Sequence, residues 1–219
     1  MKVVAVNGSP RKKGNTAVLL QNVLRGAEAN GAETNFINLY ELNFTGCISC
    51  FSCKRKDSRC NGLCAVRDDL TEVLEDILSC DSLILGSPIY FGDVTGEMRS
   101  FLERLIFPNH SYNTGKRSIF QGKITSCFIY TMNVTEEQAR QMNYEDVFQK
   151  NKNLLNVFHG EPEILVSYDT YQFNNYSSYE ASKFDEGHKA EIKMKQFPVD
   201  CQKAFEMGTH LVKRSFGNY

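Results

Sequence analysis

The N-terminal segment constrains the fold most, because a short apolar run leads directly into a glycine-containing loop and then a helix. Residues Val3–Val6 are continuously apolar, as in a parallel strand that is buried on both faces. The loop that follows reads Asn7-Gly8-Ser9-Pro10-Arg11-Lys12-Lys13-Gly14-Asn15-Thr16. From Thr16, apolar residues recur at helical spacing until Gly31. A strand, a tight loop and a helix in this order predict a parallel sheet.

The same alternation of strand and helix continues along the chain. Apolar runs and helical spacing predict further strands at residues 34–39, 81–86, 124–131 and 163–167, and further helices at 69–78, 94–105, 135–158 and 199–213. Two of these helices begin with patterns that resemble capping boxes, Asp69–Glu72 and Thr135–Gln138. We therefore expect one α/β domain over residues 1–219, with a doubly wound five-stranded parallel sheet in the order 2-1-3-4-5.

Three stretches fit no regular element: residues 40–67, 108–121 and 168–198. The first contains a cysteine-rich loop, residues 44–67, after the second strand. The last is an aromatic-rich C-terminal extension. It packs along the sheet edge or a dimer interface, covers a ligand of a neighbouring subunit, or forms a substrate pocket. Irregular stretches of this length are uncommon in a compact domain unless something organises them.

The charge and hydropathy of the chain argue against several functions. The net charge is −1 and no long basic block is present, which argues against nucleic-acid binding. No apolar run approaches the roughly 18 residues that would span a bilayer, and the apolar start is too short for a signal peptide. We therefore expect a cytoplasmic protein, in which clustered cysteines favour metal binding or redox chemistry over structural disulfides.

The loop after the first strand is a candidate anion site. Backbone N–H groups and the positive end of the following helix would face a bound anion. Neither a Walker loop nor the G-x-G-x-x-G turn is present. The alternative is a solvated turn before a capped helix. The candidate ligands of a phosphate are Ser9, Arg11, Lys13, Asn15 and Thr16.

A second loop should border the same site. In open α/β sheets, ligands lie outside the carboxyl ends of the strands where the strand order reverses, here between the first and third strands. Backbone amides and an aromatic ring after the third strand can hold a flat heterocycle, unless this loop packs into the core instead. The end of the fourth strand would border the same crevice. The candidate residues are Pro88, Ile89, Tyr90, Phe91, Gly92, Thr131 and Met132.

Five of the eight cysteines fall within eighteen residues, and three of them are spaced C-x2-C-x2-C at Cys47, Cys50 and Cys53. This run recurs in iron–sulfur proteins, where a fourth thiolate comes from elsewhere in the chain. Separated C-x2-C pairs are more typical of zinc. The interpretations that stay open are a [4Fe–4S] cluster, a zinc site and free or metal-labile thiols.

Together these motifs resemble the NADPH-dependent FMN reductase family of flavodoxin-like proteins, over residues 1 to about 135. The resemblance rests on Gly8–Arg11, Gly14–Thr16 and Gly86–Tyr90. With the cysteines added, the chain resembles the iron–sulfur flavoprotein branch, in which Cys60 or Cys64 would supply the fourth thiolate. The resemblance implies non-covalent FMN, with its phosphate at Ser9, Arg11, Asn15 and Thr16 and its ring at Pro88–Gly92. It also implies a homodimer or homotetramer.

The predicted function is an FMN-dependent oxidoreductase. Electrons would pass from NAD(P)H through FMN to a quinone, a flavin or another small acceptor, and the cofactor would supply the chemistry without a protein acid or base. Two alternatives remain. One is an iron–sulfur flavoprotein that exchanges single electrons with ferredoxin-like partners, and the other is a non-enzymatic FMN-binding redox sensor.

Overall fold

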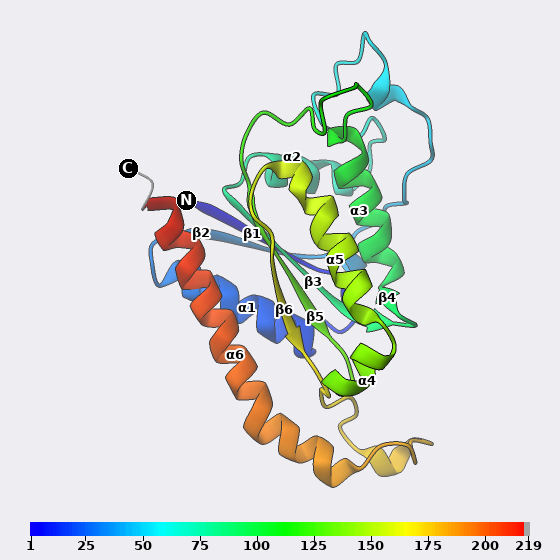
Figure 1. Ribbon diagram of the computed structural model, residues 1–219, viewed down its shortest axis with the longest axis vertical. Helices are drawn as coiled ribbons and strands as arrows, with labels where there is room; N and C mark the ends of the chain where they lie inside the picture. Colours follow the sequence, from blue (N-terminus) through cyan, green and yellow to red (C-terminus); the bar gives the residue numbers. More distant parts are fainter. Residues whose placement is uncertain (217–219) are drawn as a thin grey trace.

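The computed structural model describes residues 1–216 and is built around one twisted sheet (Figure 1). Its five parallel strands lie in the order β2-β1-β3-β5-β6. This order confirms the predicted one, counted over the parallel strands. The strands are β1 (Lys2–Asn7), β2 (Glu33–Asn38), β3 (Ser82–Tyr90), β5 (Thr125–Thr131) and β6 (Glu163–Ser167). A short strand that was not predicted, β4 (Asp93–Val94), pairs antiparallel with the end of β3.

Helices cover both faces of the sheet (Figure 1). One face carries α1 (Asn15–Glu28) and α6 (Glu186–Phe216). The other carries α2 (Leu70–Leu78), α3 (Gly96–Asn109), α4 (Glu136–Gln141) and α5 (Tyr144–Leu155). Single 3-10 turns lie at Leu39–Glu41, Ser52–Lys54, Asn156–Phe158 and Tyr176–Ser178. None of the described helices combines the length and apolarity needed to cross a membrane.

Each central strand contributes to two hydrophobic cores, because successive side chains point to opposite faces. In β1, Val3 and Ala5 pack with α1 and α6, whereas Val4 and Val6 pack with α2 and α3. All four side chains are fully buried. This explains why the strand reads as a continuous apolar run.

Two predicted helix starts differ in outcome. Thr135 and Gln138 form the expected capping box at the start of α4. The box predicted at Asp69–Glu72 is wrong, because the Asp69 carboxylate accepts a hydrogen bond from the Asn43 amide instead. The Leu70 amide at the start of α2 donates to the Asp68 carboxylate, two residues earlier.

Two predicted helix extents are also wrong. The helix expected over residues 135–158 is broken at Asn143, whose left-handed backbone (φ 56°) separates α4 from α5. The last helix begins at Glu186 rather than at 199. Its first turn is stabilised by Asp185, whose carboxylate accepts from the His188 amide. Pro198 lies inside this helix, so the extension predicted to be irregular over 168–198 is helical from Glu186 onward.

Candidate functional site

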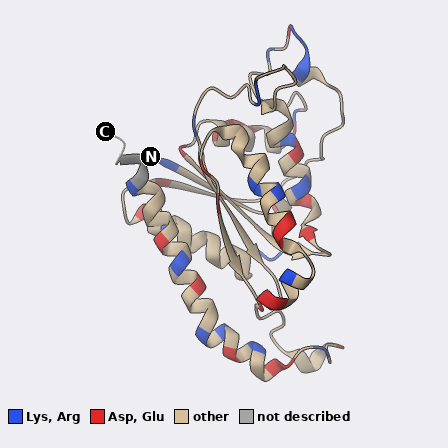
Figure 2. Ribbon diagram, viewed as in Figure 1, with Lys and Arg blue, Asp and Glu red and all other residues tan. Residues whose placement is uncertain are grey.

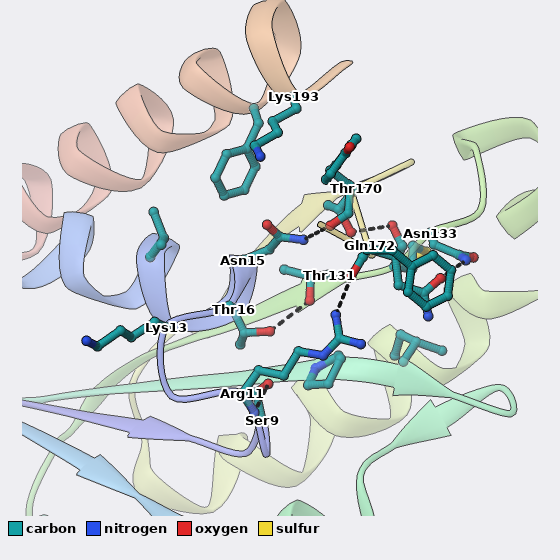
Figure 3. Close-up of a pocket in the computed structure, with 18 of the residues that line it drawn as sticks. Ser9, Arg11, Lys13, Asn15, Thr16, Thr131, Asn133, Thr170, Gln172 and Lys193 are labelled. Atoms are coloured by element: carbon teal, nitrogen blue, oxygen red, sulfur yellow. Dashed lines mark hydrogen bonds between the residues drawn. The ribbon is translucent and has the colours of Figure 1, made fainter. Parts of the chain in front are cut away.

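A cavity of about 750 Å³ opens at the carboxyl ends of β1, β3 and β5 (Figure 3). Its lining comes from the loop after β1, the start of α1, the ends of β3 and β5, the segment after β6, and α6. Ten of the twelve predicted cofactor residues line it: Ser9, Arg11, Lys13, Asn15, Thr16, Pro88, Ile89, Tyr90, Thr131 and Met132. The strand order therefore brings the two predicted loops to one site, as the switch-point rule requires.

Phe91 and Gly92 do not line this cavity. They form the tip of the β3–β4 hairpin, where both have positive φ angles (50° and 86°). This pair of angles is typical of a two-residue hairpin turn whose twist matches the strands. The turn leaves the Phe91 ring fully exposed. Their predicted role at a cofactor ring stays a prediction.

The loop after β1 is held by its neighbours on the sheet. The Gly8 amide donates to the Gly86 carbonyl at 2.8 Å, and the Thr95 hydroxyl donates to the Gly8 carbonyl at 2.6 Å. A Cβ atom on Gly8 would lie 2.9 Å from the Cβ of Met98. Only glycine therefore lets this loop approach α3 so closely. The Asn7 carboxamide completes the turn by accepting from the Ser9 amide.

The start of α1 leaves its amides free for an anion. Gly14, Asn15 and Thr16 line the cavity. The helix has no side-chain cap and no acidic residue in its first turn, whereas Thr95 and Thr135 cap α3 and α4. The first N–H groups of a helix have no partner within the helix, and the helix end carries partial positive charge. Among the described residues, the cavity lining also contains no Asp or Glu. These features fit a phosphate group.

Three of the predicted donors also make hydrogen bonds to other segments (Figure 3). The Thr16 and Thr131 hydroxyls lie 2.8 Å apart and join α1 to β5. The Arg11 guanidinium donates to the Gln172 carbonyl at 2.6 Å, and the Asn15 carboxamide donates to the Tyr171 carbonyl at 2.9 Å. Arg11 and Asn15 therefore hold the segment after β6 over the loop.

That segment, residues 168–185, is called the strap here. Near the start of the strap, the Thr170 amide and hydroxyl both donate to the Met132 carbonyl. The Asn133 carboxamide donates to the Gln172 side chain at 2.6 Å. Asp169, also at the start of the strap, forms an ion pair with Lys189, which is buried on α6. The strap thus covers the cavity of its own chain, and the roles considered for this extension stay predictions.

The strap and α6 supply cavity residues that the sequence did not single out as ligands. They are Thr170, Tyr171, Gln172, Phe173, Asn174, Tyr179, Lys193 and Phe197, with Val18 from α1 and Asn133 after β5. The aromatic content of residues 168–184 was the one signal that pointed to this region. No sequence pattern indicated that Lys193 lines the cavity, because the last helix was predicted to begin at residue 199.

The cysteine-rich loop lies at the opposite end of α3 from the cavity (Figure 1). Cys47, Cys50, Cys53 and Cys64 line a second hollow of only about 10 Å³, enough for about one water molecule. Cys60 is not among its lining residues. Ser49 and Phe51, on either side of Cys50, both have a φ of 55°. Such backbone strain concentrates at functional sites.

The environments of these thiols differ. Hydrogen bonds from Ser52 lower the pKa of Cys50, which is exposed, whereas burial raises the pKa of Cys53. Burial also lowers the pKa of Lys54, whose ammonium donates to the carbonyls of Phe107, Pro108 and His110 at the end of α3. A thiol with a lowered pKa is the more nucleophilic one at neutral pH.

The donor types of this loop suit an iron–sulfur cluster, but their arrangement does not form its ligand set. Within residues 1–216, no three His, Cys, Asp or Glu side chains are close enough together to hold a metal ion. Of the remaining cysteines, Cys80 and Cys127 are buried in the core, and Cys201 is half-buried on α6.

The chain is similar in sequence to known iron-sulfur flavoproteins. It is 38% identical over 104 residues to an iron-sulfur flavoprotein of Methanocaldococcus jannaschii (48% of this chain and 51% of the relative). It is 32% identical over 145 residues to an iron-sulfur flavoprotein of Archaeoglobus fulgidus (65% of this chain and 61% of the relative). The chain therefore spans between about half and three fifths of the length of these relatives.

The fold agrees with this relationship. A solved NAD(P)H:quinone oxidoreductase from Methanothermobacter marburgensis superimposes with a TM-score of 0.68 at 16% identity, covering 96% of both chains. The family model described as NADPH-dependent FMN reductase matches residues 1–159, which include the loop after β1, the ends of β3 and β5, and the cysteine-rich loop. The chain belongs to the NADPH-dependent FMN reductase family.

Proposed function

We propose that this chain binds FMN in the 750 Å³ cavity and catalyses NAD(P)H-dependent reduction of a small acceptor such as a quinone or a free flavin. The observation that carries the proposal is the uncapped start of α1, which lines the cavity beside the loop after β1 and forms its floor. No acidic side chain is among the described lining residues. A phosphate dianion is the ligand chemistry that this arrangement favours.

The residues present suggest how the cofactor would be held. The amides of Asn15 and Thr16 and the hydroxyls of Ser9 and Thr16 would bind the phosphate. Arg11 uses one of its five N–H donors on the strap, so the others remain for the same phosphate. Pro88–Tyr90 and Thr131–Asn133 would line the ring. FMN supplies hydride and electron transfer when bound, so the protein contributes position and electrostatics.

The test compares FMN with riboflavin, which lacks the phosphate. Charged hydrogen bonds are worth about 1.5–3 kcal/mol, so we expect FMN to bind at least about tenfold more tightly. Fluorescence quenching of each flavin measures both affinities. Arg11→Gln should reduce the ratio of FMN affinity to riboflavin affinity. Arg25→Gln, at the other end of α1, should leave this ratio unchanged. Equal affinity for the two flavins, or no NADPH oxidation with a quinone present, would contradict the proposal.

A second candidate is an electron carrier that docks an acidic redox protein. Residues 44–67 and 108–123 lie together at one tip of the molecule, where the ribbon in Figure 2 is coloured blue at several Lys and Arg positions. They carry eight basic residues and one acidic residue in a chain of net charge −1. The basic residues are Lys54, Arg55, Lys56, Arg59, Arg67, Lys116, Arg117 and Lys123. This charge favours an acidic partner.

For this candidate, the loop would have to draw its thiols together around a cluster. The deciding measurement is iron and acid-labile sulfide in protein purified without oxygen, where about four irons per chain are expected. Cys64→Ser should lower the iron content, and Cys201→Ser should not. Protein without iron that still oxidises NADPH at full rate would favour the first candidate.

A further inference from the structure

The roof of the cavity belongs to a part of the chain that the family match does not reach. The match ends at residue 159, whereas the strap and α6 follow it. Tyr171, Phe173 and Tyr179 of the strap and Lys193 and Phe197 of α6 all line the cavity. If a flavin occupies the floor, as proposed above, these five residues meet whatever binds over it.

The aromatic rings of the roof pack against one another. The Phe173 and Tyr179 rings are stacked, with centroids 4.3 Å apart and planes inclined by 17°. Tyr176 contacts Phe173 and Tyr171 edge-on at 5.1 and 5.2 Å. Tyr176 is buried, and its hydroxyl accepts from the Gln172 amide. Rigid rings of this kind favour binding of another planar ring.

Lys193 adds an unbalanced positive charge to this roof. Figure 3 shows its side chain descending from α6 toward the strap. Its ammonium lies 4.4 Å from the centre of the Tyr171 ring, and it forms no ion pair with a described carboxylate. The neighbouring lysines on α6 do form ion pairs: Lys189 pairs with Asp169, and Lys195 pairs with Glu191.

We propose that the roof is a subsite for a planar ring substrate that carries an anionic group, and that Lys193 binds this group. The inference rests on the proposed function. Two sources fit the same chemistry: an acceptor with a sulfonate or carboxylate, and the 2′-phosphate of NADPH. In the assay, NADPH, a proton and a quinone give NADP⁺ and the hydroquinone, so two electrons leave the donor and two enter the acceptor.

The experiment measures two ratios of kcat/KM in the FMN-loaded protein. The first compares anthraquinone-2-sulfonate with neutral 2-(hydroxymethyl)anthraquinone, and the second compares NADPH with NADH. Lys193→Gln should lower at least one ratio about tenfold, since a charged hydrogen bond is lost. Lys193→Arg should keep that ratio at the wild-type value, and 0.5 M NaCl should lower the ratio in the wild type because salt screens the charge. Lys195→Gln, whose lysine does not line the cavity, should leave both ratios unchanged.

The outcome also identifies the source of the charge. A fall in the quinone ratio assigns Lys193 to the acceptor, and a fall in the nucleotide ratio assigns it to the donor. Two unchanged ratios overturn the inference. Calorimetric binding of anthraquinone-2-sulfonate to the wild type and to Lys193→Gln provides a readout without turnover. Weaker binding of anthraquinone-2-sulfonate to Lys193→Gln supports the roof subsite even if the protein binds no flavin. This result therefore separates the inference from the proposed function.

Discussion

Among single residues, Arg104 connects the cysteine-rich loop to the core. Its side chain is fully buried and forms a two-pronged ion pair with Asp68, at 2.8 and 3.0 Å. It also donates to the carbonyls of Thr45 and Val66, so both ends of the loop attach to one point on α3. The Cys64 thiol lies beside the same guanidinium. A buried charge needs this number of partners to offset its desolvation.

Replacing this arginine tests its role. We expect Arg104→Met to lower the free energy of unfolding by about 3–5 kcal/mol, because Asp68 and two carbonyls lose their donors. Urea unfolding followed by circular dichroism measures the change. Arg55→Met, which removes an exposed pair with Asp57, should stay within about 1 kcal/mol of the wild type. A similarly small loss in Arg104→Met would show that the loop is anchored elsewhere.

Asp68 should make stability depend on pH. Burial raises the pKa of Asp68, but hydrogen bonds and charge from Arg104 outweigh it and hold the pKa below its ordinary value. The stabilisation is therefore complete above the unfolded-chain pKa of about 4 and is lost as pH falls through the lower folded value. The difference in unfolding free energy between wild type and Asp68→Asn should be constant from about pH 7 to 5 and shrink below about 4.

Urea titrations at each pH measure this difference. Glu180→Gln, in the exposed part of the strap, serves as the control and should show only a small difference throughout. A difference for Asp68→Asn that stays constant down to pH 3 would mean that the folded and unfolded pKa values of Asp68 are equal.

At the scale of secondary-structure elements, the contact between α1 and α6 depends on two glycines. A Cβ on Gly26 would lie 2.0 Å from the Phe205 carbonyl oxygen, and one on Gly208 would lie 1.9 Å from that of Val23. The two backbones therefore approach closely, and no side chain fits between them. Because α6 also carries Lys193 and Phe197, this contact fixes the position of the cavity roof.

Alanine at this contact should separate the helices. We expect Gly208→Ala to destabilise the protein by about 1–3 kcal/mol through overpacking, although alanine has the higher helix propensity. Gly96→Ala is the matched control, since that helical glycine has open space around its missing side chain and should be neutral or slightly stabilising. The midpoint of urea unfolding compares the two. Equal midpoints would contradict the close approach.

At the scale of the whole molecule, α3 connects the two candidate sites. Thr95 at its start holds the Gly8 carbonyl at the cavity, and Arg104 holds the cysteine-rich loop. These residues lie nine positions apart on one helix, about 14 Å along its axis. The predicted homodimer or homotetramer stays a prediction, and the fully exposed Phe91 at the hairpin tip is the residue to probe for it.

Flavin binding should stabilise the entire fold, because the cavity is lined by segments from both halves of the chain. At about 100 times its dissociation constant, a ligand adds about 2.7 kcal/mol. For a chain of this size we expect FMN to raise the Tm by about 5–10 °C, followed by circular dichroism. Riboflavin at the same concentration should give a smaller increase. A Tm that FMN leaves unchanged would argue against this cavity as its site.

The sequence by itself predicted the strand order, the family and ten of the cavity residues. Local patterns indicated the elements and motifs, and the rule for doubly wound sheets indicated the order of the strands. Buried parallel strands read as apolar runs, and the loop after β1 has its glycines and donors within ten residues. The tertiary structure alone decided what covers the cavity. The last helix was predicted to begin at residue 199, but α6 begins at Glu186 and contains Pro198. Lys193 and the strap therefore reach a site more than 150 residues earlier in the chain. Contacts over such separations leave no periodic signal in the sequence.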